Sequence, residues 1–309
     1  MSYEKVILVT RPTRLQDTVK RYNTKAQAAF YIERRGQSFA DYELEDETYA
    51  RARDSLLHLI PSDLKIQIID RSFLPNFLFA PNDVVVCLGQ DGLVVNTAKY
   101  LNGQPVVAVN PDPDRFDGIL LPFQVGNAHS AFDALLKGKQ QTRKITMARV
   151  DLNDGQHLYA FNDLFLGPKS HISARYTIRI GDKSERQMSS GILVSTPAGS
   201  TGWFSSLMNQ TRGLSRFGGV AANVSAKARK WEERELTFAV REPFASKWSG
   251  VEIVAGLIRE RDSLIVESHM AEAGVIFSDG MEQDFLAFNS GATATVRIAE
   301  KITELVVQT

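Results

Sequence analysis

The chain has 309 residues, which is enough for two ordinary domains or one large one without metal or disulfide staples. Lys and Arg together number 36, and so do Asp and Glu, so the formal net charge is zero. Proteins that bind nucleic acid or anionic membranes usually carry a basic excess, so the composition argues against both partners. The apolar fraction of 43% and the charged fraction of 23% are typical of globular proteins.

The single cysteine, Cys87, cannot form an internal disulfide or a cysteine metal cluster, which fits a reducing compartment. Because it is flanked by apolar residues in a predicted strand, we expect it in the core rather than acting as a nucleophile. The first residues lack the pattern of a secretory signal, and no apolar run approaches the ~20 residues of a membrane span. The histidines show no metal-ligand spacing. A cytoplasmic protein without a membrane partner is therefore predicted.

Residues 1–142 alternate between short β-branched runs and longer helical stretches, which predicts an α/β domain with a parallel sheet. Strands are expected over Lys5–Thr10, Leu64–Ile69, Val84–Leu88 and Pro105–Asn110. Helices are expected over Thr13–Arg35, Leu44–Leu59, Gly92–Leu101 and Ser130–Leu136. Loops are expected over Arg71–Asp83 and Asn110–Arg115. The second loop follows a strand at the edge where open α/β sheets bind ligands.

From residue 143 the pattern changes to strands separated by polar turns, which predicts a mainly antiparallel all-β domain over residues 143–309. The expected strands are Ile145–Leu152, His157–Phe165, Ala174–Ile180, Ile192–Ser195, Leu236–Val240, Leu264–Glu267, Gly274–Phe277, Phe285–Phe288 and Ala294–Ile298. Gly181-Asp182-Lys183 predicts a hairpin turn. Two domains joined by a polar, basic connector near residue 140 are therefore expected.

The strongest local motif is Gly89-Gln90-Asp91-Gly92, which joins the buried strand Val84–Leu88 to a helix. Glycine lets backbone N–H groups approach a phosphate, and a helix N-terminus adds its positive dipole. Asp91 would repel a phosphate unless it binds a metal or accepts the proton of an attacking hydroxyl. An Asp-Gly turn with a helix-capping aspartate is the alternative, and the residues alone leave both open.

Three further polar motifs occur in the second half. Ser195-Thr-Pro-Ala-Gly-Ser-Thr-Gly-Trp203 ends a strand in a hydroxyl-rich turn that could bind a nucleotide or simply cap the next helix. Asn162 and Asp163 place an amide and a carboxylate in an apolar strand, where they could bind adenine and ribose or form a satisfied polar pair. Ser278-Asp279-Gly280 is by itself a hairpin turn.

The order of these motifs resembles the NAD kinase family, whose motifs are G-G-D-G, N-E, T-P-T-G-S-T and a late D-G. The resemblance extends over residues 84 to about 300, and residues 110–118, 189–191 and 238–243 look closest to the branch that includes the mitochondrial NAD kinases of animals. It implies an NAD kinase-like two-domain fold and transfer of a phosphoryl group from ATP, with Mg²⁺, to the 2′-hydroxyl of the adenosine ribose of NAD or NADH. A homodimer or higher homo-oligomer is also implied.

The resemblance also implies roles by motif position. Asp91 would be the general base for the 2′-hydroxyl proton or would organise the metal and phosphates. The nucleotide-binding positions would be Gly89, Gln90 and Gly92 for the phosphates, Asn162 and Asp163 for the adenosine of NAD, and Thr196, Ser200 and Thr201 for the adenine and ribose. No dedicated metal-ligand set is predicted.

The chain departs from the family pattern mainly in the phosphate loop. Gln90 replaces a glycine and Leu93 replaces a threonine, so a side chain occupies room near the phosphates and a hydroxyl is lost. Asp163 replaces Glu, Ala198 replaces a hydroxyl residue, and Ser190 stands where many relatives carry Asp. A weakly active or non-catalytic nucleotide-binding protein, and a kinase for a sugar or other small molecule, therefore stay open as alternatives. A lipid kinase is disfavoured because no basic membrane face or apolar entry is present.

A basic stretch, Arg212–Arg234, lies between two β segments and includes Lys227, Arg229 and Lys230. The simplest interpretation is a solvent-exposed, mobile loop, and the alternative is a lid that reaches the triphosphate.

Overall fold

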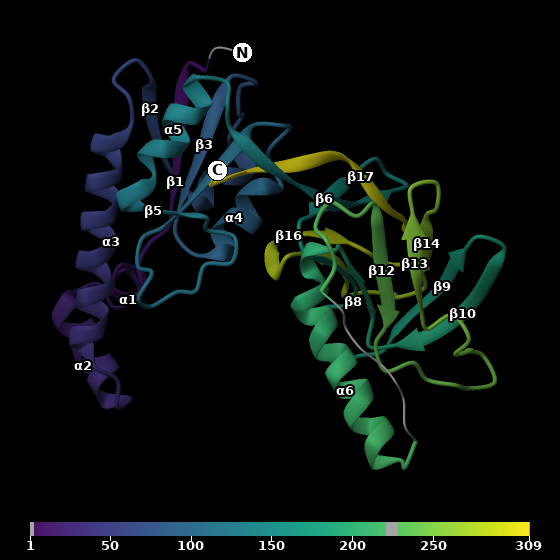
Figure 1. Cartoon of the computed structure of the whole chain (residues 1–309). Helices are drawn as coiled ribbons and strands as arrows, with labels where there is room; N and C mark the ends of the chain where they lie inside the picture. Colours follow the sequence, from purple (N-terminus) through teal and green to yellow (C-terminus); the bar gives the residue numbers. More distant parts are fainter. Residues whose placement is uncertain (1–2, 221–227, 309) are drawn as a thin grey trace. The chain divides into compact units, whose positions relative to one another are not determined.

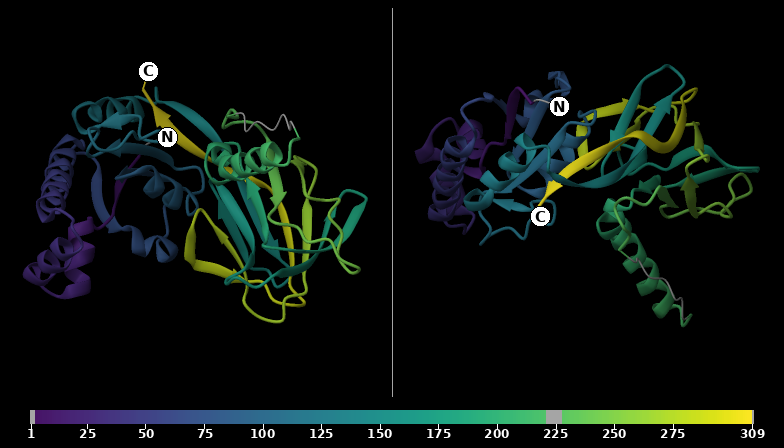
Figure 2. Two further views of the ribbon diagram at one scale, coloured as in Figure 1. Left: turned by 90° about the horizontal axis from the view of Figure 1, so that it is seen from below. Right: turned by 45° about the horizontal axis from the view of Figure 1, so that its top comes forward.

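The computed structural model describes residues 3–220 and 228–308 (Figures 1 and 2). It divides into two compact units: Met1–Arg143 with Glu304–Thr309 form unit 1, and Lys144–Thr303 form unit 2. The predicted second domain, 143–309, differs from unit 2 at its C-terminal end. The last strand, β17 (Thr293–Val307), pairs at Glu304 and Leu305 with a strand of unit 1, so the final residues of the chain belong there.

Unit 1 is built on a parallel sheet, as predicted. The strand order is β4 (Pro105–Asn110), β3 (Asp83–Leu88), β1 (Lys5–Thr10) and β2 (Lys65–Asp70), and the end of β17 and the short β5 (Phe123–Gln124) also pair with β4. Every residue of β3 and β4 is buried, which explains why these strands are continuous apolar runs. All four predicted strands are confirmed to within one residue. Cys87 lies in β3 as a core residue, and burial raises the pKa of its thiol to about 12.

The helices of unit 1 are α1 (Arg14–Tyr22), α2 (Lys25–Arg34), α3 (Phe39–Leu59), α4 (Asp91–Ala98) and α5 (His129–Leu136), with 3₁₀ turns η1 (Arg71–Asn76) and η2 (Val125–Asn127). The prediction of one helix over Thr13–Arg35 is wrong. Asn23 has a left-handed φ of 67° that ends α1, and the Thr24 side chain accepts the Gln27 N–H to begin α2. The next helix begins at Phe39 rather than Leu44, because Ser38 caps it.

The core of unit 1 on one face of the sheet is formed by α3 and α5. Tyr49 and Leu56 of α3 and Phe132 of α5 pack there against Val6 and Val86 of the sheet. This packing holds α3 beside the carboxyl ends of β1 and β3, where the predicted phosphate loop begins.

Unit 2 contains two mainly antiparallel sheets around one hydrophobic core, which confirms the predicted β fold. One sheet has the order β13 (Ala255–Arg259), β12 (Glu235–Val240), β11 (Ile192–Ser195), β8 (Asp163–Pro168), β15 (Gly274–Ser278) and β16 (Met281–Ala287). The other contains β10 (Lys183–Ser189), β9 (Ala174–Ile180), β14 (Leu264–Ser268), β17, β6 (Gln141–Leu152) and β7 (His157–Ala160). The hairpin predicted at Gly181–Lys183 joins β9 to β10. Strands β10 and β13 lie outside the ranges predicted from the sequence.

The predicted strand His157–Phe165 is instead two strands, and this correction bears on function. β7 ends at Ala160 and pairs with β6, whereas β8 begins at Asp163 and pairs with β11 and β15 in the other sheet. The chain therefore changes sheets at Phe161 and Asn162, so this motif lies at a break between strands rather than inside one.

A 3₁₀ turn, η3 (Ala198–Thr201), leads from β11 into α6 (Trp203–Phe217). The predicted basic stretch Arg212–Arg234 thus begins inside α6, and Lys227 lies outside the described residues. Beyond that gap, the Arg229 side chain binds Glu233, Glu235 and Thr237. Among the described residues, no helix combines the length and the apolar character needed to cross a membrane.

Candidate functional site

The loop Gly89–Gly92 joins β3 to α4 at the carboxyl edge of the parallel sheet of unit 1. Gln90 is the N-cap residue of α4 and its side chain makes no capping hydrogen bond, while Asp91 is the first helical residue. One Asp91 carboxylate oxygen accepts the backbone N–H of Leu120 at 2.7 Å. The alternative of a helix-capping aspartate is therefore wrong. Gln90 holds the N-cap position, and the Asp91 carboxylate instead binds the loop that contains Leu120.

The two glycines of this loop have different surroundings. A Cβ on Gly89 would lie 2.9 Å from Cδ2 of Leu93, so the buried Leu93 side chain closes that side of the loop. A Cβ on Gly92 would have no atom within 4 Å, and Gly92 is exposed. The open side of the loop is therefore at Gly92, next to Asp91 and the positive end of α4.

The strand order places this loop at a topological switch point. From β1 the chain continues to β2 on one side of the sheet, and from β3 it continues to β4 on the other, so the loops after β1 and β3 diverge. The Tyr49 hydroxyl joins the two strand ends, because it donates to the Leu88 carbonyl at 2.9 Å and accepts the Arg11 N–H at 3.2 Å. In open α/β sheets such a point is where ligands bind.

A second polar cluster lies in unit 2 around Asp279, which directly follows β15. The Asp279 carboxylate accepts the backbone N–H groups of Phe161, Asn162 and Asp163 at 3.0, 2.7 and 3.2 Å. The Asp279 N–H in turn donates to the Asp163 carbonyl at 3.0 Å. Asp279 therefore holds the break between β7 and β8 in place. Sequence reasoning gave Asp279 no role of its own, although the late Asp-Gly motif was the signal that could have found it.

Asp163 is a buried carboxyl group with a strongly perturbed environment. It is 8% exposed and lies opposite Ser195 in the β8–β11 pairing. Burial first, and then the negative charge of Asp279, raise the pKa of Asp163 from 3.8 to about 7. The buried Ser278 hydroxyl has no hydrogen-bond partner within the described part of the chain. Because its pKa is near 7, the Asp163 carboxyl group can either donate or accept hydrogen bonds near neutral pH.

The turn that follows β11 packs directly on the Asn162 segment. The Thr196 hydroxyl donates to the Phe161 carbonyl at 2.5 Å, and the Thr196 N–H donates to the Asn162 carbonyl at 2.9 Å. A Cβ on Gly199 would overlap the Asn162 carbonyl group, so only glycine permits this approach. The Ser200 hydroxyl donates to the Pro197 carbonyl at 2.7 Å. These hydroxyl groups shape the turn itself.

The predicted site residues thus form one set in each unit. Unit 1 carries Gly89, Gln90, Asp91 and Gly92, and unit 2 brings together Asn162, Asp163, Thr196, Ser200 and the exposed Thr201. The structure adds Asp279 to the second set.

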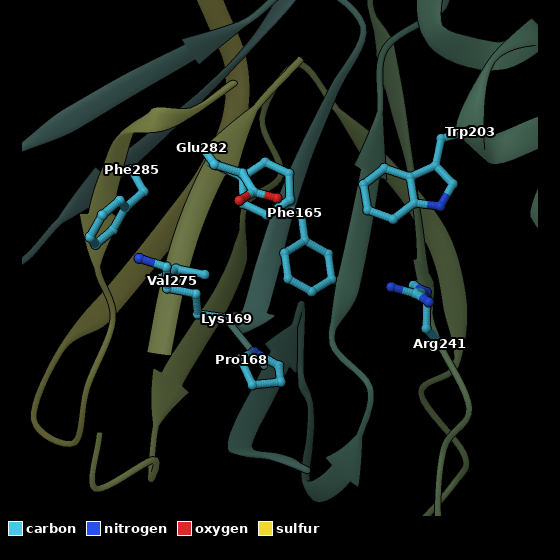
Figure 3. A pocket seen from close by; sticks show the side chains of 9 residues that line it. Phe165, Pro168, Lys169, Trp203, Arg241, Val275, Glu282 and Phe285 are labelled. Carbon is cyan, nitrogen blue, oxygen red and sulfur yellow. The ribbon is translucent and has the colours of Figure 1, made fainter. Parts of the chain in front are cut away.

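An aromatic pocket of about 170 Å³ also lies in unit 2 (Figure 3). The rings of Phe165 and Trp203 stack at 5.6 Å between centroids, and Phe277 lies 5.0 Å from Phe165. The Arg241 guanidinium lies 5.4 Å from the Trp203 ring, and Lys169 also lines the pocket. Stacked rings beside a guanidinium group suit a planar, polar ligand. Trp203 ends the hydroxyl-rich motif, so its position was the signal for a site that sequence reasoning missed.

Small residues make room for the central ring of this pocket. A Cβ on Gly167 or on Gly191 would lie 2.6 Å from the Phe165 ring, and Gly191 also has a φ of 108°. The glycine of the motif at residues 189–191 is therefore explained by the packing of Phe165.

The chain thus combines an α/β unit and a β unit, and each unit carries one set of the predicted site residues. No family model matches the chain. The chain is 28% identical over 222 residues to a probable NADH kinase of Oryza sativa subsp. japonica, in an alignment that covers 64% of this chain. It is 29% identical over 129 residues to an NAD kinase of Clostridium kluyveri, in an alignment that covers 39% of this chain. The matched parts span 63% and 44% of those two proteins.

Two solved structures have the same fold. Yeast NADH kinase, in complex with NADH, superposes with a TM-score of 0.61 and 14% identity, covering 100% of this chain and 85% of that one. An NAD kinase from Archaeoglobus fulgidus, in complex with ATP, gives a TM-score of 0.54 and 14% identity, covering 97% and 92%. The chain is therefore similar in sequence to NAD and NADH kinases, and it shares the fold of these two solved structures.

Proposed function

We propose that the chain is a phosphotransferase that transfers the γ-phosphoryl group of ATP to the 2′-hydroxyl of the adenosine ribose of NAD or NADH. The observation that carries this proposal is Asp91, a half-buried carboxylate at the positive end of α4 beside the open side of Gly92. A carboxylate at a phosphate-binding position is useful when it accepts a proton from the attacking hydroxyl. The motif order and the similarity to NAD and NADH kinases support the choice of substrate.

The proposed reaction is an in-line displacement. The ribose 2′-oxygen forms a bond to the γ-phosphorus, the bond from that phosphorus to the oxygen it shares with the β-phosphate breaks, and Asp91 takes the hydroxyl proton. The products are NADP or NADPH, ADP and a proton. Gln90 and Gly92 present backbone N–H groups to the donor phosphates, and the α4 dipole adds to their positive potential. The Gly89 N–H donates to the Val109 carbonyl at 3.2 Å, so Gly89 lines the loop without offering its N–H to the ligand.

Mg²⁺ is expected to accompany the donor, where it neutralises charge on the phosphates. Among the described residues, no group of three or more acidic, histidine or cysteine side chains could hold a metal ion. A Mg²⁺ bound with the donor would take most of its ligands from phosphate oxygens and water, and Asp91 is the residue that would hold it if it does not act as the base.

Unit 2 is proposed to bind the dinucleotide. Asn162 offers an amide to the adenine edge, Asp163 offers a carboxyl group to ribose hydroxyls, and Thr196, Ser200 and Thr201 line the turn beside them. The aromatic pocket at Trp203 accepts a planar ring of the same ligand. The NADH and ATP complexes of the two structural neighbours support nucleotides as the ligands.

The decisive experiment measures NADP(H) formation from NAD and from NADH with Mg²⁺ and, in turn, ATP, other nucleoside triphosphates and polyphosphate. Asp91→Asn is expected to lower kcat by about 100-fold or more while the Kd for NAD measured by calorimetry stays within two-fold, as a rough limit. Absence of NADP(H) with every donor, in wild-type protein shown to be folded, would overturn the proposal.

Nucleotide binding without catalysis is a second candidate, and Gln90 favours it. Where a glycine would leave the backbone bare, Gln90 places a side chain at the N-cap that makes no capping hydrogen bond. This candidate predicts NAD binding without phosphoryl transfer, whereas catalysis predicts steady turnover and a lower donor KM in Gln90→Gly.

We also propose that the chain is cytoplasmic and forms a homodimer or higher homo-oligomer. The isolated, buried Cys87 fits a reducing compartment. Sedimentation equilibrium tests the assembly, and a mass equal to one chain at micromolar concentration contradicts it.

A further inference from the structure

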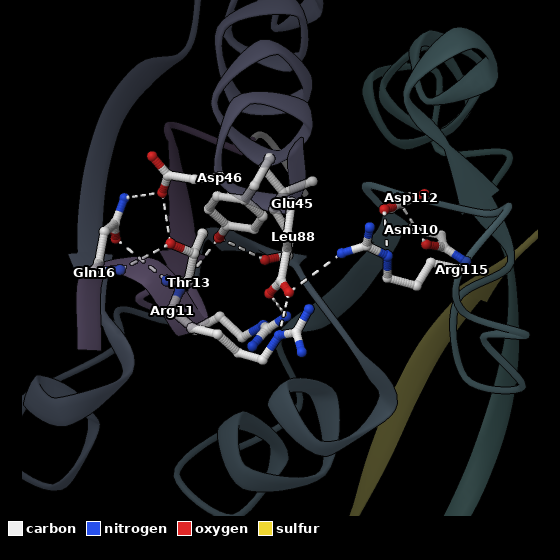
Figure 4. Close-up of polar contacts among 11 residues, drawn as sticks. Arg11, Thr13, Gln16, Glu45, Asp46, Leu88, Asn110, Asp112 and Arg115 are labelled. Atoms are coloured by element: carbon white, nitrogen blue, oxygen red, sulfur yellow. Dashed lines mark hydrogen bonds and ion pairs between the residues drawn. The ribbon is translucent and has the colours of Figure 1, made fainter. Parts of the chain in front are cut away.

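Three arginines converge on one buried carboxylate in unit 1 (Figure 4). Glu45 of α3 is 4% exposed. Its carboxylate lies 2.5 Å from Nε of Arg14, 3.3 Å from Nη1 of Arg115 and 3.7 Å from Nη2 of Arg11. Arg115 also pairs with Asp112 at 3.5 Å. We call these five residues the arginine cluster, and its three cations exceed its two anions.

The cluster lies beside the loop Gly89–Gly92. Arg11 directly follows β1, and its Cδ would lie 3.6 Å from a Cβ on Gly89. The Arg11 N–H donates to the Tyr49 hydroxyl, which donates to Leu88 at the end of β3. The guanidinium groups therefore stand at the point where the loops after β1 and β3 diverge.

Arg115 reaches the arginine cluster from the loop after β4, and side-chain hydrogen bonds of Asn110 fix the conformation of that loop. The Asn110 side chain donates to the Phe116 carbonyl at 2.8 Å and accepts the Asp112 N–H at 3.0 Å. The same loop continues to Leu120, whose N–H binds Asp91. The segment that carries Arg115 is thus tied to the proposed catalytic carboxylate.

The arginine cluster contains more hydrogen-bond donors than its carboxylates can accept. Each guanidinium carries several N–H donors, and one carboxylate saturates only some of them. Nε of Arg11 is buried and has no hydrogen-bond partner among the described residues. The side chains of Arg14 and Arg115 are 49% and 29% exposed, so an anion can reach them from solvent. Glu45 and Asp112 balance two of the three arginine charges, so one positive charge of the cluster is left for an anion to neutralise.

We infer that Arg11, Arg14 and Arg115 bind the polyphosphate chain of the phosphoryl donor, and that Glu45 is the positioning residue that holds their guanidinium groups. Planar guanidinium groups bind phosphate oxygens in pairs of parallel hydrogen bonds, which suits the triphosphate of a nucleotide or an inorganic polyphosphate. The inference rests on the proposed function and deepens it. It also accounts for Gln90, because arginine donors beside the loop can hold phosphates where the Gln90 side chain restricts their approach to the backbone.

The test compares the full-length wild type with Arg115→Gln and with the control Arg34→Gln. Arg34 is an arginine of the same unit that lies over the Phe30 ring in α2, outside the arginine cluster. The Kd values for Mg-ATP and for inorganic tripolyphosphate are measured by calorimetry, with thermal unfolding to check the fold. Arg115→Gln is expected to raise both Kd values about ten-fold or more, and Arg34→Gln to change neither by more than about two-fold.

The two probes distinguish the possible sources of phosphate. Equal weakening of ATP and tripolyphosphate supports recognition of the phosphate chain itself. Unchanged Kd values for both probes in folded Arg115→Gln overturn the inference, and so does an equal loss in Arg34→Gln, which would reflect net charge alone. Arg115→Lys is expected to fall between the wild type and Arg115→Gln, because it keeps the charge and loses the paired hydrogen bonds.

Kinetics separate this inference from the proposed function. If the wild type forms NADP, Arg115→Gln is expected to raise the KM for ATP about ten-fold with the KM for NAD unchanged. NADP formation with an unaltered ATP KM in Arg115→Gln refutes the inference and leaves the function standing. Tripolyphosphate binding that depends on Arg115 in a protein that makes no NADP with any donor refutes the function and leaves the anion site standing.

Discussion

In unit 1 the polar residues of the candidate site stand on loops at the ends of parallel strands and leave donors accessible, whereas in unit 2 they are largely bound to one another. Gly92 is open and Arg115 is partly exposed, but Asp279 is occupied by three backbone N–H groups and Thr196 by the Asn162 segment. Because of this difference, we expect substitutions at the unit 1 site to alter ligand binding with little effect on the free energy of unfolding. Changes in unit 2 should alter stability and binding together.

The largest expected effect tests the buried acid of unit 2. Because the native pKa of Asp163 is raised from 3.8 to about 7, the native state holds a proton that the unfolded state has lost between those pH values. Its contribution to stability therefore falls as pH rises from about 4 to about 7, by about 1.4 kcal/mol per pKa unit. Asp163→Asn removes this loss and should be more stable than the wild type at pH 8 if the neutral form is well accommodated.

Urea unfolding at pH 5 and pH 8 measures the effect. Asp182→Asn, in the exposed turn between β9 and β10, serves as the control and should keep the wild-type dependence on pH. An equal pH dependence in Asp163→Asn and the wild type would contradict the assignment.

The next effect tests the close approach of the turn to the Asn162 segment. Gly199→Ala places a methyl group on the Asn162 carbonyl, so one segment must move. We expect a loss of about 3 kcal/mol in the free energy of unfolding, with weaker NAD binding. Chemical unfolding and calorimetry check both, and a variant as stable as the wild type would show that the turn is not packed as described.

A smaller loss is expected when the Asp279 carboxylate is changed. Asn tolerates the left-handed backbone at this position, where φ is 55°, so Asp279→Asn mainly replaces an accepting oxygen by an N–H donor. The cost should be about 2 kcal/mol, since buried N–H groups lose a charged acceptor. Asp154→Asn is the control, because that exposed carboxylate accepts the single backbone N–H of Gln156. Similar losses in the two variants, measured by urea unfolding, would argue against a special role for Asp279.

The smallest stability effect is expected in unit 1. Gly92→Ala meets no neighbouring atom and lies in the first turn of α4, so stability should stay the same or rise by up to about 1 kcal/mol. The donor KM should nevertheless rise, because the methyl group occupies the open side of the loop. Thermal unfolding and donor kinetics measure the two effects separately. An unchanged donor KM would mean that phosphate does not approach at Gly92.

Local sequence patterns predict an element correctly where burial alone determines which residues it contains. Strands β3 and β4 of unit 1 are buried on both faces, so continuous apolar runs predict them to within one residue. The helix over Thr13–Arg35 was misread because its apolar spacing continues through Asn23, where only the backbone φ shows the break. A single strand over His157–Phe165 is predicted because apolar residues lie on both sides of Asn162 and Asp163, whereas the hydrogen bonds that separate β7 from β8 come from Asp279.

The sequence by itself determined the fold class, the order of the four motifs and the place of Asp91 at a strand end, because each is a local pattern. The break between strands at Asn162 was not among these. Only the tertiary structure shows which side chains from different parts of the chain lie in contact. The arginine cluster unites residues from the β1 loop, α3 and the β4 loop, and the strand order of the sheet brings them to one edge. Likewise, the raised pKa of Asp163 depends on burial and on Asp279, and neither can be read from its neighbours in the chain.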